Sequence, residues 1–281
     1  MAEQAHGIAY DPRALDETER RFWRECWESV PADVAAERGI ELRNFGPIQA
    51  SAIASLPEVR MLNLVLGAAE PGALEGGHLA DALDWTESLG VDCYVPVKPG
   101  SAEASAAEDR LKSRGYELGY AWMKFVRDPS PSTLYEPEGV EVVELTAGEG
   151  EPLGRIGAEG FNLPPWAGAF FRDLPGREGW RCYAAEIDGR PQACAAMLIH
   201  NGVAEFGIAA TLEIARGRGC QTALLHRRIE DARAAGCHTL FVETGERTTD
   251  RPSASYRNIL RAGFKEAYLR PNWRHPDQPR T

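Results

Sequence analysis

The sequence has no long apolar run, and this absence excludes a membrane-spanning helix. The chain has 281 residues, of which 43% are hydrophobic and 26% charged, but no run approaches the roughly 18 apolar residues that a spanning helix needs. The first residues, Met1 to His6, are polar and contain no apolar signal-peptide region. No low-complexity tract is present. The composition is that of a globular protein with one large or two ordinary domains.

Basic residues are scarce. Lys and Arg number 31 against 42 Asp and Glu, for a formal net charge of -11. A nucleic-acid-binding surface needs a basic face, so this balance argues against general nucleic-acid binding. It weakly favours the approach of a cationic small molecule.

Paired cysteine motifs are also missing. The six cysteines form no C-x-x-C pair and have no zinc-ligand spacing with histidine, so we predict no metal site. Several lie in apolar, strand-like segments, where cysteine behaves as a small hydrophobic residue. The simplest interpretation is a reduced, cytoplasmic protein. Cys220 lies in a glycine-rich turn before a predicted helix, where it is either filler or a thiol whose pKa the helix lowers.

The second half of the chain has a clear order of predicted elements. Asp188-Gly189 and Asn201-Gly202 are hairpin turns, and they predict an antiparallel meander of three strands. A helix over 221–235 and a strand over 238–243 follow, and their short connection implies parallel pairing with the meander. The further predicted elements are a strand over 139–145, a helix over 149–161, a loop over 245–252, a helix over 253–262 and a last strand carrying Tyr268 and Trp273.

The first half repeats this order. Strands over 61–68, 91–97 and 117–126 alternate with helices over 77–89 and 103–114. Gly90 corresponds to Gly236, and Gly115-Tyr116 corresponds to Gly263-Phe264. We therefore predict two copies of one α/β unit. The Pro- and Ser-rich segment after Val126 is typical of an interdomain linker, which gives domains at 1–128 and 138–281 with a linker at 129–137.

The segment Arg216-Gly217-Arg218-Gly219-Cys220-Gln221 lies between the meander and the next helix. A turn of this kind directs backbone N–H groups and a helix dipole at one point, which suits a phosphate group. Glycine permits close approach and positive φ. His226, Arg227 and Arg228 extend the basic character. No Lys-Ser/Thr follows the glycines and the order G-x-G-x-x-G is absent, so Walker-type and dinucleotide sites are disfavoured.

This turn resembles the acetyl-CoA signature of the GCN5-related N-acetyltransferase (GNAT) family: Arg or Gln, two residues, Gly, one residue, then Gly or Ala. Gln221 stands at the last position and departs from that pattern. The segment Ser253 to Phe264 looks like the family's second cofactor-side helix, which closes in Gly-Phe. The resemblance covers about residues 138–274. The first half looks like a degenerate copy without the glycine-rich basic turn.

The resemblance implies two tandem GNAT-like acyl-CoA N-acyltransferase domains of α/β class, each a mixed sheet flanked by helices. It implies acetyl-CoA as co-substrate, with its pyrophosphate on the turn and its pantetheine arm along the end of the preceding strand. The cofactor-binding residues it assigns are Ala210, Thr211, Leu212, Arg216, Gly217, Arg218, Gly219, Cys220, Gln221, Thr222, Ala223 and Asn258.

Acetyl transfer to an amine needs a base that removes a proton. Glu205 and Glu243 lie on the two strands that bracket the expected thioester position, and Glu243 ranks higher because it is at a strand's C-terminal end. For Glu205 the preferred alternative is a strand residue that faces outward and has no role in catalysis. The family often has a tyrosine four residues before the Gly of Gly-Phe as general acid, but Ile259 stands here. Tyr256, one turn earlier, is the candidate substitute or a packed tyrosine.

The function expected by resemblance is transfer of an acetyl group from acetyl-CoA to a primary amine of a small molecule, in a ternary complex of a monomer or homodimer. The alternatives are transfer of another acyl or aminoacyl group and a non-catalytic acyl-CoA sensor. The acceptor pocket is expected between Phe161 and Trp180. The aromatic residues of that region can also form the interface between the two halves.

Overall fold

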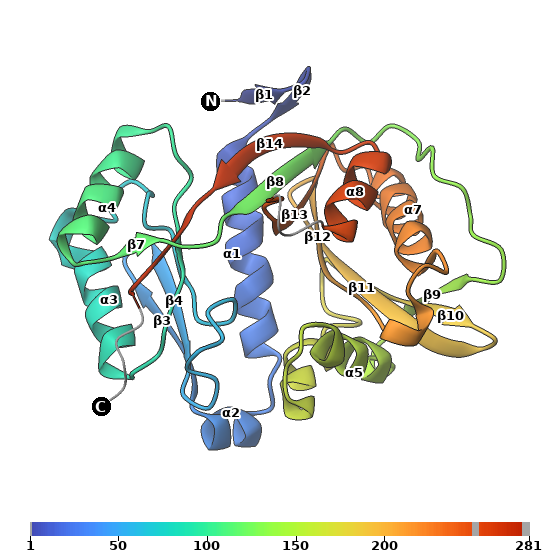
Figure 1. The fold of residues 1–281 in the computed structure, drawn as a ribbon, viewed down its shortest axis with the longest axis horizontal. Coiled ribbons are helices and arrows are strands. Elements are labelled where there is room, and N and C mark those ends of the chain that lie inside the picture. The colour runs from blue at the N-terminus through green and yellow to red at the C-terminus, as the bar shows by residue number, and fades with distance from the viewer. Residues whose placement is uncertain (1, 249–252, 277–281) are drawn as a thin grey trace. The chain divides into compact units, whose positions relative to one another are not determined.

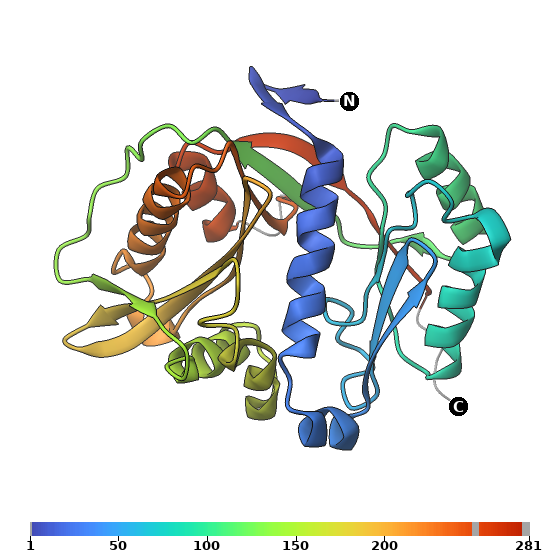
Figure 2. The same cartoon turned by 180° about the vertical axis from the view of Figure 1, so that it is seen from behind.

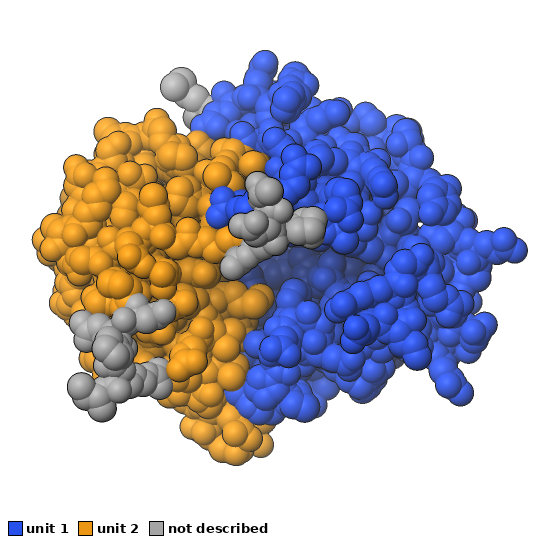
Figure 3. Space-filling view, in the orientation of Figure 1, with its two compact units in different colours: residues 1–31, 124–267 blue, residues 32–123, 268–281 orange. Residues whose placement is uncertain are grey.

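The structure is a computed structural model that describes residues 2–248 and 253–276. Two compact units divide the chain: Met1–Pro31 with Lys124–Ala267, and Ala32–Met123 with Tyr268–Thr281. Figure 3 shows them in different colours. Each unit combines segments from both ends of the chain, so the units divide the chain elsewhere than at 128 and 138. The domain limits predicted from the repeat in the sequence, 1–128 and 138–281, stay a prediction.

Unit 1 is built on a seven-stranded mixed sheet (Figure 1). Its strands in spatial order are β14 (Lys265–Arg270), β8 (Trp122–Arg127), β13 (Thr239–Gly245), β12 (Val203–Thr211), β11 (Arg190–His200), β10 (Trp180–Ile187) and β9 (Glu141–Leu145). Strands β10, β11 and β12 form the predicted antiparallel meander, and β13 pairs with β12 in parallel. A hairpin of β1 (Glu3–Ala5) and β2 (Ile8–Tyr10) precedes the first helix.

Helices cover both faces of this sheet. One face carries α7 (Cys220–Ala234) and α8 (Ala254–Arg261), as Figure 1 shows. The other face carries α1 (Pro12–Glu28), α5 (Glu151–Gly160), α6 (Ala169–Arg172) and the 3-10 turn η2 (Pro165–Gly168), which Figure 2 shows from behind. Ser253 caps α8 as predicted, because its side chain accepts a hydrogen bond from the Tyr256 N–H at 3.1 Å.

Unit 2 contains two three-stranded sheets. The first has the order β3 (Ile40–Phe45), β4 (Ile48–Ile53), β5 (Val65–Leu66), and the second has the order β6 (Val95–Pro96), β15 (Asn272–Arg274), β7 (Glu117–Leu118). Its helices are α2 (Ala32–Arg38), α3 (His78–Ser88) and α4 (Ala102–Ser113), preceded at α3 by the 3-10 turn η1 (Glu75–Gly77). One apolar core includes Leu83, Val95, Leu111 and Trp273.

Each unit has a sheet that contains a strand from the other half of the chain. In unit 1, β8 comes from the first half of the chain and lies between β13 and β14. In unit 2, β15 comes from the end of the chain and lies between β6 and β7. This exchange corrects the predicted strand over 117–126, which is two strands interrupted at Gly119. The Gly119 N–H donates to the Asn272 carbonyl at 2.8 Å, and a Cβ at Gly119 would lie 2.9 Å from the same oxygen.

Other predicted elements also differ in length. The strand over 61–68 is reduced to β5, because the Asn63 side chain accepts from the Ile53 N–H at 2.7 Å and donates to the Leu56 carbonyl at 2.8 Å, which replaces strand pairing. The single last strand is two strands, β14 and β15. No element was predicted for residues 7–60, where α1, α2, β3 and β4 lie. Residues 249–252 of the predicted loop fall outside the described residues.

All six cysteines are buried with free thiols. None of the helices in the described ranges is long and apolar enough to cross a bilayer.

Gly207 on β12 fixes how closely α1 approaches the sheet. A Cβ at this position would lie 2.3 Å from Cζ of Phe22, which is 2% exposed on α1. We expect Gly207→Ala to lower the free energy of unfolding by about 1–3 kcal/mol through overpacking, measured by urea denaturation. In a Phe22→Leu background, which removes the ring edge, the same substitution should cost less. An equal cost in both backgrounds would contradict this account of the packing.

Candidate functional site

A cavity of about 460 Å³ lies at the N-terminal end of α7 in unit 1. Residues of β12, the turn before α7 and α8 line it: Ala209, Ala210, Thr211, Ala215, Arg216, Gly217, Gly219, Cys220, Gln221, Thr222, Ala254, Ser255, Asn258 and Arg261. Tyr135, Gly160, Cys194 and Leu224 complete the wall. Figure 3 shows unit 1 hollowed on the face viewed, between the positions of α8 and α5 in Figure 1.

The sheet opens where β12 leaves β13. Their parallel pairing runs from Val203 with Thr239 to Phe206 with Val242, after which both strands continue without it. A bulge follows at once in β12: three residue steps there, from Gly207 to Ala210, face two on β11, and Ile208 has φ +47°. The bulge bends β12, whose end stays paired with β11 through Ala210 and Thr211 and forms one wall of the cavity.

The glycine-rich turn has the predicted conformation. Gly217 has φ +79° and Gly219 has φ +89°, in the left-handed region that favours glycine. Gly219 is the N-cap of α7 and has no side chain to satisfy the first N–H groups of the helix. These N–H groups and the positive end of the helix dipole therefore face the cavity, which suits an anion. Arg216 and Arg218 are exposed on the turn, and Arg216 lines the cavity.

A polar bridge joins α7 and α8 at the cavity. The Asn258 amide donates to the Gln221 Oε1 at 2.6 Å, and the Gln221 amide donates to the Ser255 hydroxyl at 3.3 Å. All three residues line the cavity. Gln221, which departs from the small residue expected at this position of the turn, thus couples the two helices. Sequence reasoning gave no role to Ser255.

The strand end is only partly available to a ligand. The Leu212 N–H donates to the Gln192 carbonyl on β11 at 2.9 Å, and Leu212 is not among the lining residues. Backbone groups alternate sides along a strand, so the Thr211 N–H points away from β11, toward the opening of the sheet. Of the strand positions predicted to contact a cofactor, Ala210 and Thr211 line the cavity, while Leu212 does not.

Comparison with known proteins identifies this architecture. Residues 138–246 match the model of the acetyltransferase (GNAT) domain family. This segment is similar to a GNAT domain. No significantly similar protein was found among the curated proteins.

Solved structures match over nearly the whole chain. A GCN5-related N-acetyltransferase from Kribbella flavida has a TM-score of 0.60 at 16% identity, covering 94% of this chain and 95% of that chain. A tandem GNAT protein from the clavulanic acid biosynthesis pathway has a TM-score of 0.60 at 16% identity, covering 96% and 97%. A third, from Sphaerobacter thermophilus, has a TM-score of 0.52 at 15% identity, covering 76% and 72%. The tandem GNAT fold predicted from the sequence is confirmed, and this fold supports acyl transfer in general.

The two predicted base candidates occupy different environments in unit 1. Glu205 is 4% exposed and pairs with Phe241 inside the parallel ladder. Glu243 lies one residue beyond the ladder, and its side chain is 17% exposed. Neither side chain is among those lining the 460 Å³ cavity. Glu243 is the more accessible of the two from the opening of the sheet.

Glu243 belongs to a buried ion cluster that the sequence did not reveal. The Nζ of Lys124 on β8 lies 2.9 Å from Oε2 of Glu243 and 3.0 Å from Oε2 of Glu19 on α1. The side chains of Lys124 and Glu19 are 0% and 2% exposed. Both come from the first half of the chain, so no local motif joins them to Glu243. The only sequence signal was a lysine inside an apolar strand.

Tyr256 is not brought to the cavity. It is 4% exposed, its ring lies edge-on to Phe125 at 4.8 Å, and its hydroxyl donates to Oε1 of Glu266 at 2.5 Å. Burial, then the hydrogen bond to Glu266, raise the pKa of Tyr256 to about 12. Ile259 is also buried. A packed tyrosine, the second of the predicted alternatives, describes this position.

Cys220 behaves as filler in the turn. It is 1% exposed, and burial raises the pKa of its thiol. The alternative, a thiol whose pKa the helix lowers, is therefore wrong, because the pKa of Cys220 is raised.

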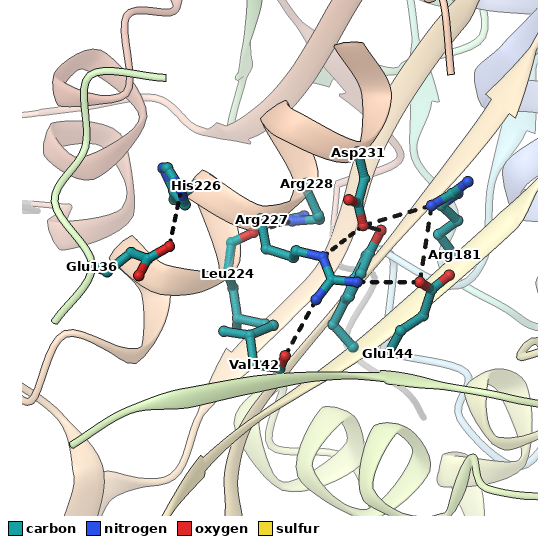
Figure 4. A network of polar contacts seen from close by, with 10 residues as sticks. Glu136, Val142, Glu144, Arg181, Leu224, His226, Arg227, Arg228 and Asp231 are labelled. Atoms are coloured by element: carbon teal, nitrogen blue, oxygen red, sulfur yellow. Dashed lines mark hydrogen bonds and ion pairs between the residues drawn. The ribbon is translucent and has the colours of Figure 1, made fainter. Parts of the chain in front are cut away.

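The expected basic extension on α7 is also wrong, because its side chains are engaged inside unit 1 (Figure 4). Nε of Arg227 donates to Oδ2 of Asp231 at 2.8 Å, and its Nη2 lies 3.3 Å from Oε2 of Glu144. Arg228 is 1% exposed and donates to the carbonyls of Ala196 and Leu224, both at 3.2 Å. Burial lowers the pKa of Arg228 to about 10. Arg216 on the turn and Arg261 on α8 are the arginines that line the cavity, while Arg218 is exposed on the turn outside the lining.

The aromatic segment expected to form the acceptor pocket divides into two groups. Phe170 and Phe171 are buried in the core, and Trp180 packs on Phe22 of α1 with ring centroids 4.7 Å apart. Leu163 and Trp166 line a second cavity of about 450 Å³ with Glu151, Arg155, Glu159 and Arg172. Of the large apolar side chains named here, Leu163 and Trp166 therefore line a cavity and the other three do not.

Lys124 should be essential to the fold of unit 1. We expect Lys124→Met to lower the free energy of unfolding by about 3–5 kcal/mol, because it removes the buried ammonium that Glu19 and Glu243 share. The double variant Lys124→Met with Glu19→Met removes both charges and should recover most of this loss, as measured by urea denaturation. The exposed Lys112→Met serves as control. A double variant no more stable than Lys124→Met would refute the charge-compensation argument.

Proposed function

We propose that the chain is an N-acetyltransferase that moves an acetyl group from acetyl-CoA to a primary amine of a small molecule, in a ternary complex. The observation that carries the proposal is the cavity where the opened sheet meets the left-handed glycine turn of α7. It joins an anion-binding end to an extended strand edge, the two features that a phosphorylated, pantetheine-bearing cofactor requires.

The residues present fit this cofactor. The α7 N-terminus with Gly217, Gly219 and Arg216 would hold the pyrophosphate, and Thr211 on β12 would pair with the pantetheine arm. Asn258 and Gln221 would supply polar contacts from the bridge between α7 and α8. The cofactor contributes an activated acetyl thioester. The chain contributes the position of that thioester and the removal of the amine's proton.

Glu243 is the proposed proton acceptor, directly or through a water molecule. It lies just past the β12–β13 ladder, where the sheet opens. The amine nitrogen forms a bond to the acetyl carbon, the carbon–sulfur bond breaks, the sulfur leaves as a thiolate, and Glu243 takes the proton. A thiolate leaves readily, so the engaged hydroxyl of Tyr256 does not prevent the reaction. The net charge of -11 favours the approach of a cationic amine.

A second candidate function is a non-catalytic acyl-CoA sensor. Ile259 at the family's usual acid position and the buried, hydrogen-bonded Tyr256 favour it. A thiol-release assay over a panel of amines separates the two functions. Release that depends on an amine supports the enzyme, whereas acetyl-CoA binding without release supports the sensor. The same thiol-release assay, with longer acyl-CoAs in place of acetyl-CoA, tests the alternative of another acyl donor.

Gly219→Glu should abolish acetyl-CoA binding, because it places a bulky negative charge at the anion site in a left-handed conformation. The measurement is a thermal-shift titration with acetyl-CoA and with CoA. Gly236→Glu is a matched control at the other end of α7, with φ +76° and no atom within 4 Å of its Cβ position. It should bind as the wild type does. Retained binding in Gly219→Glu, or equal loss in both, would count against the site.

Glu243→Gln should lower kcat by about 10²–10⁴-fold, the usual contribution of a general base, while the affinity for acetyl-CoA stays unchanged. Glu205→Gln is the matched comparison, and its effect on kcat should be smaller because Glu205 is buried inside the ladder. Steady-state thiol release gives kcat, and calorimetry gives affinity. A larger kcat loss in Glu205→Gln would reverse the assignment.

A further inference from the structure

The linker between the two halves passes beside the candidate cofactor cavity. Figures 1 and 2 show the chain after β8 running along α7 before it enters β9. Arg127 holds the start of this segment by donating to the carbonyls of Asp128, Ser130 and Pro131 at 2.6–2.9 Å. The sequence suggested an ordinary extended connection here. The structure instead shows a segment with specific attachments.

Three contacts attach the linker to α7 and its turn. The Ser132 N–H donates to Oε1 of Glu230 at 2.6 Å, and Oε1 of Glu136 lies 3.5 Å from Nε2 of His226, which Figure 4 shows. Pro137 lies against the turn, since a Cβ at Gly219 would be 2.6 Å from its Cβ. These contacts follow α7 from its C-terminal half to its N-terminus, so the linker ends at the anion site.

Tyr135 lies between the contacts of Ser132 and Glu136 and lines the cavity. It is 70% exposed, and Ile214, just before the lining residues Ala215 and Arg216, is 84% exposed. They are the two most exposed large hydrophobic side chains in the part of the chain that the structure describes. Both residues belong to segments that border the glycine-rich turn, and of the two only Tyr135 lines the cavity.

We propose that Tyr135 is a binding residue for the nucleotide base of the cofactor, which stacks on its ring. The inference rests on the proposed function and extends it, because it brings the linker into the cofactor site. A base next to the pyrophosphate-binding turn has a flat, largely apolar face, and an aromatic ring offers the matching surface. Arg216, which lines the same cavity, provides charge for the phosphates, so one ligand can contact Tyr135 with its base and Arg216 with its phosphates.

The test is isothermal titration calorimetry with CoA, 3′-dephospho-CoA and acetyl-pantetheine, which lacks the nucleotide. Tyr135→Ala should raise the Kd for CoA and dephospho-CoA about tenfold, the loss of one base–aromatic stack, and leave the Kd for acetyl-pantetheine unchanged. Tyr135→Phe should bind as the wild type does, since the ring is kept. Thr133→Ala, elsewhere in the linker, is the matched control for disturbance of the segment.

The outcomes separate this inference from the proposed function. Wild-type binding of CoA together with unchanged affinity in Tyr135→Ala would overturn the stacking role alone. An equal loss for acetyl-pantetheine would also overturn it, because the ring would then act away from the base. Failure of the wild type to bind CoA, dephospho-CoA and acetyl-pantetheine would overturn the proposed function and this inference with it.

Discussion

The candidate site depends on the departure of β12 from β13. Parallel strands normally continue side by side, with each backbone group paired, but here the ladder stops at Phe206 and Val242 and a bulge with Ile208 at φ +47° follows. The unpaired edge is then available to a ligand, and the turn of α7 follows β12 directly. The strand edge and the anion site are thus close in sequence. One extended ligand can therefore contact both, with a different part at each. Gly207, at the start of the bulge, also lets Phe22 of α1 close the opposite face.

The opened sheet needs support that its own half of the chain does not supply. On the α1 face, that support is Lys124 of β8 with Glu19 of α1, both from the first half, meeting Glu243 at the end of the ladder. A buried ammonium between two carboxylates is stable only with both the strand and the helix in place. The strand exchange therefore has a local consequence inside unit 1: the surroundings of the proposed base are completed by residues that precede the linker.

Residues in local patterns were predictable and residues joined by topology were not. The meander, α7, α8 with its Ser253 cap, and the left-handed glycines of the turn follow from hairpin turns, helical spacing and glycine placement, which are properties of short segments. The strand exchange, α1 and the Lys124 cluster depend on which distant strands pair, and no short segment contains that information. The error at Arg227 and Arg228 has a related cause. Their positions in α7 were correct, but only the neighbouring strands decide that these cations are used by Asp231, Glu144 and the Ala196 carbonyl.

The distribution of the arginines explains how an acidic chain can present an anion site. Arg227 and Arg228 are neutralised or buried within unit 1, so they stabilise the packing of α7 and add little to the field outside. Arg216 and Arg218 are exposed on the turn that precedes α7, and no side chain caps the first N–H groups of that helix. Backbone dipoles carry no net charge, and the site therefore attracts an anion locally without making the surface basic. In the proposed function, the turn would therefore hold the phosphorylated co-substrate, while the overall negative charge would favour the approach of a cationic amine.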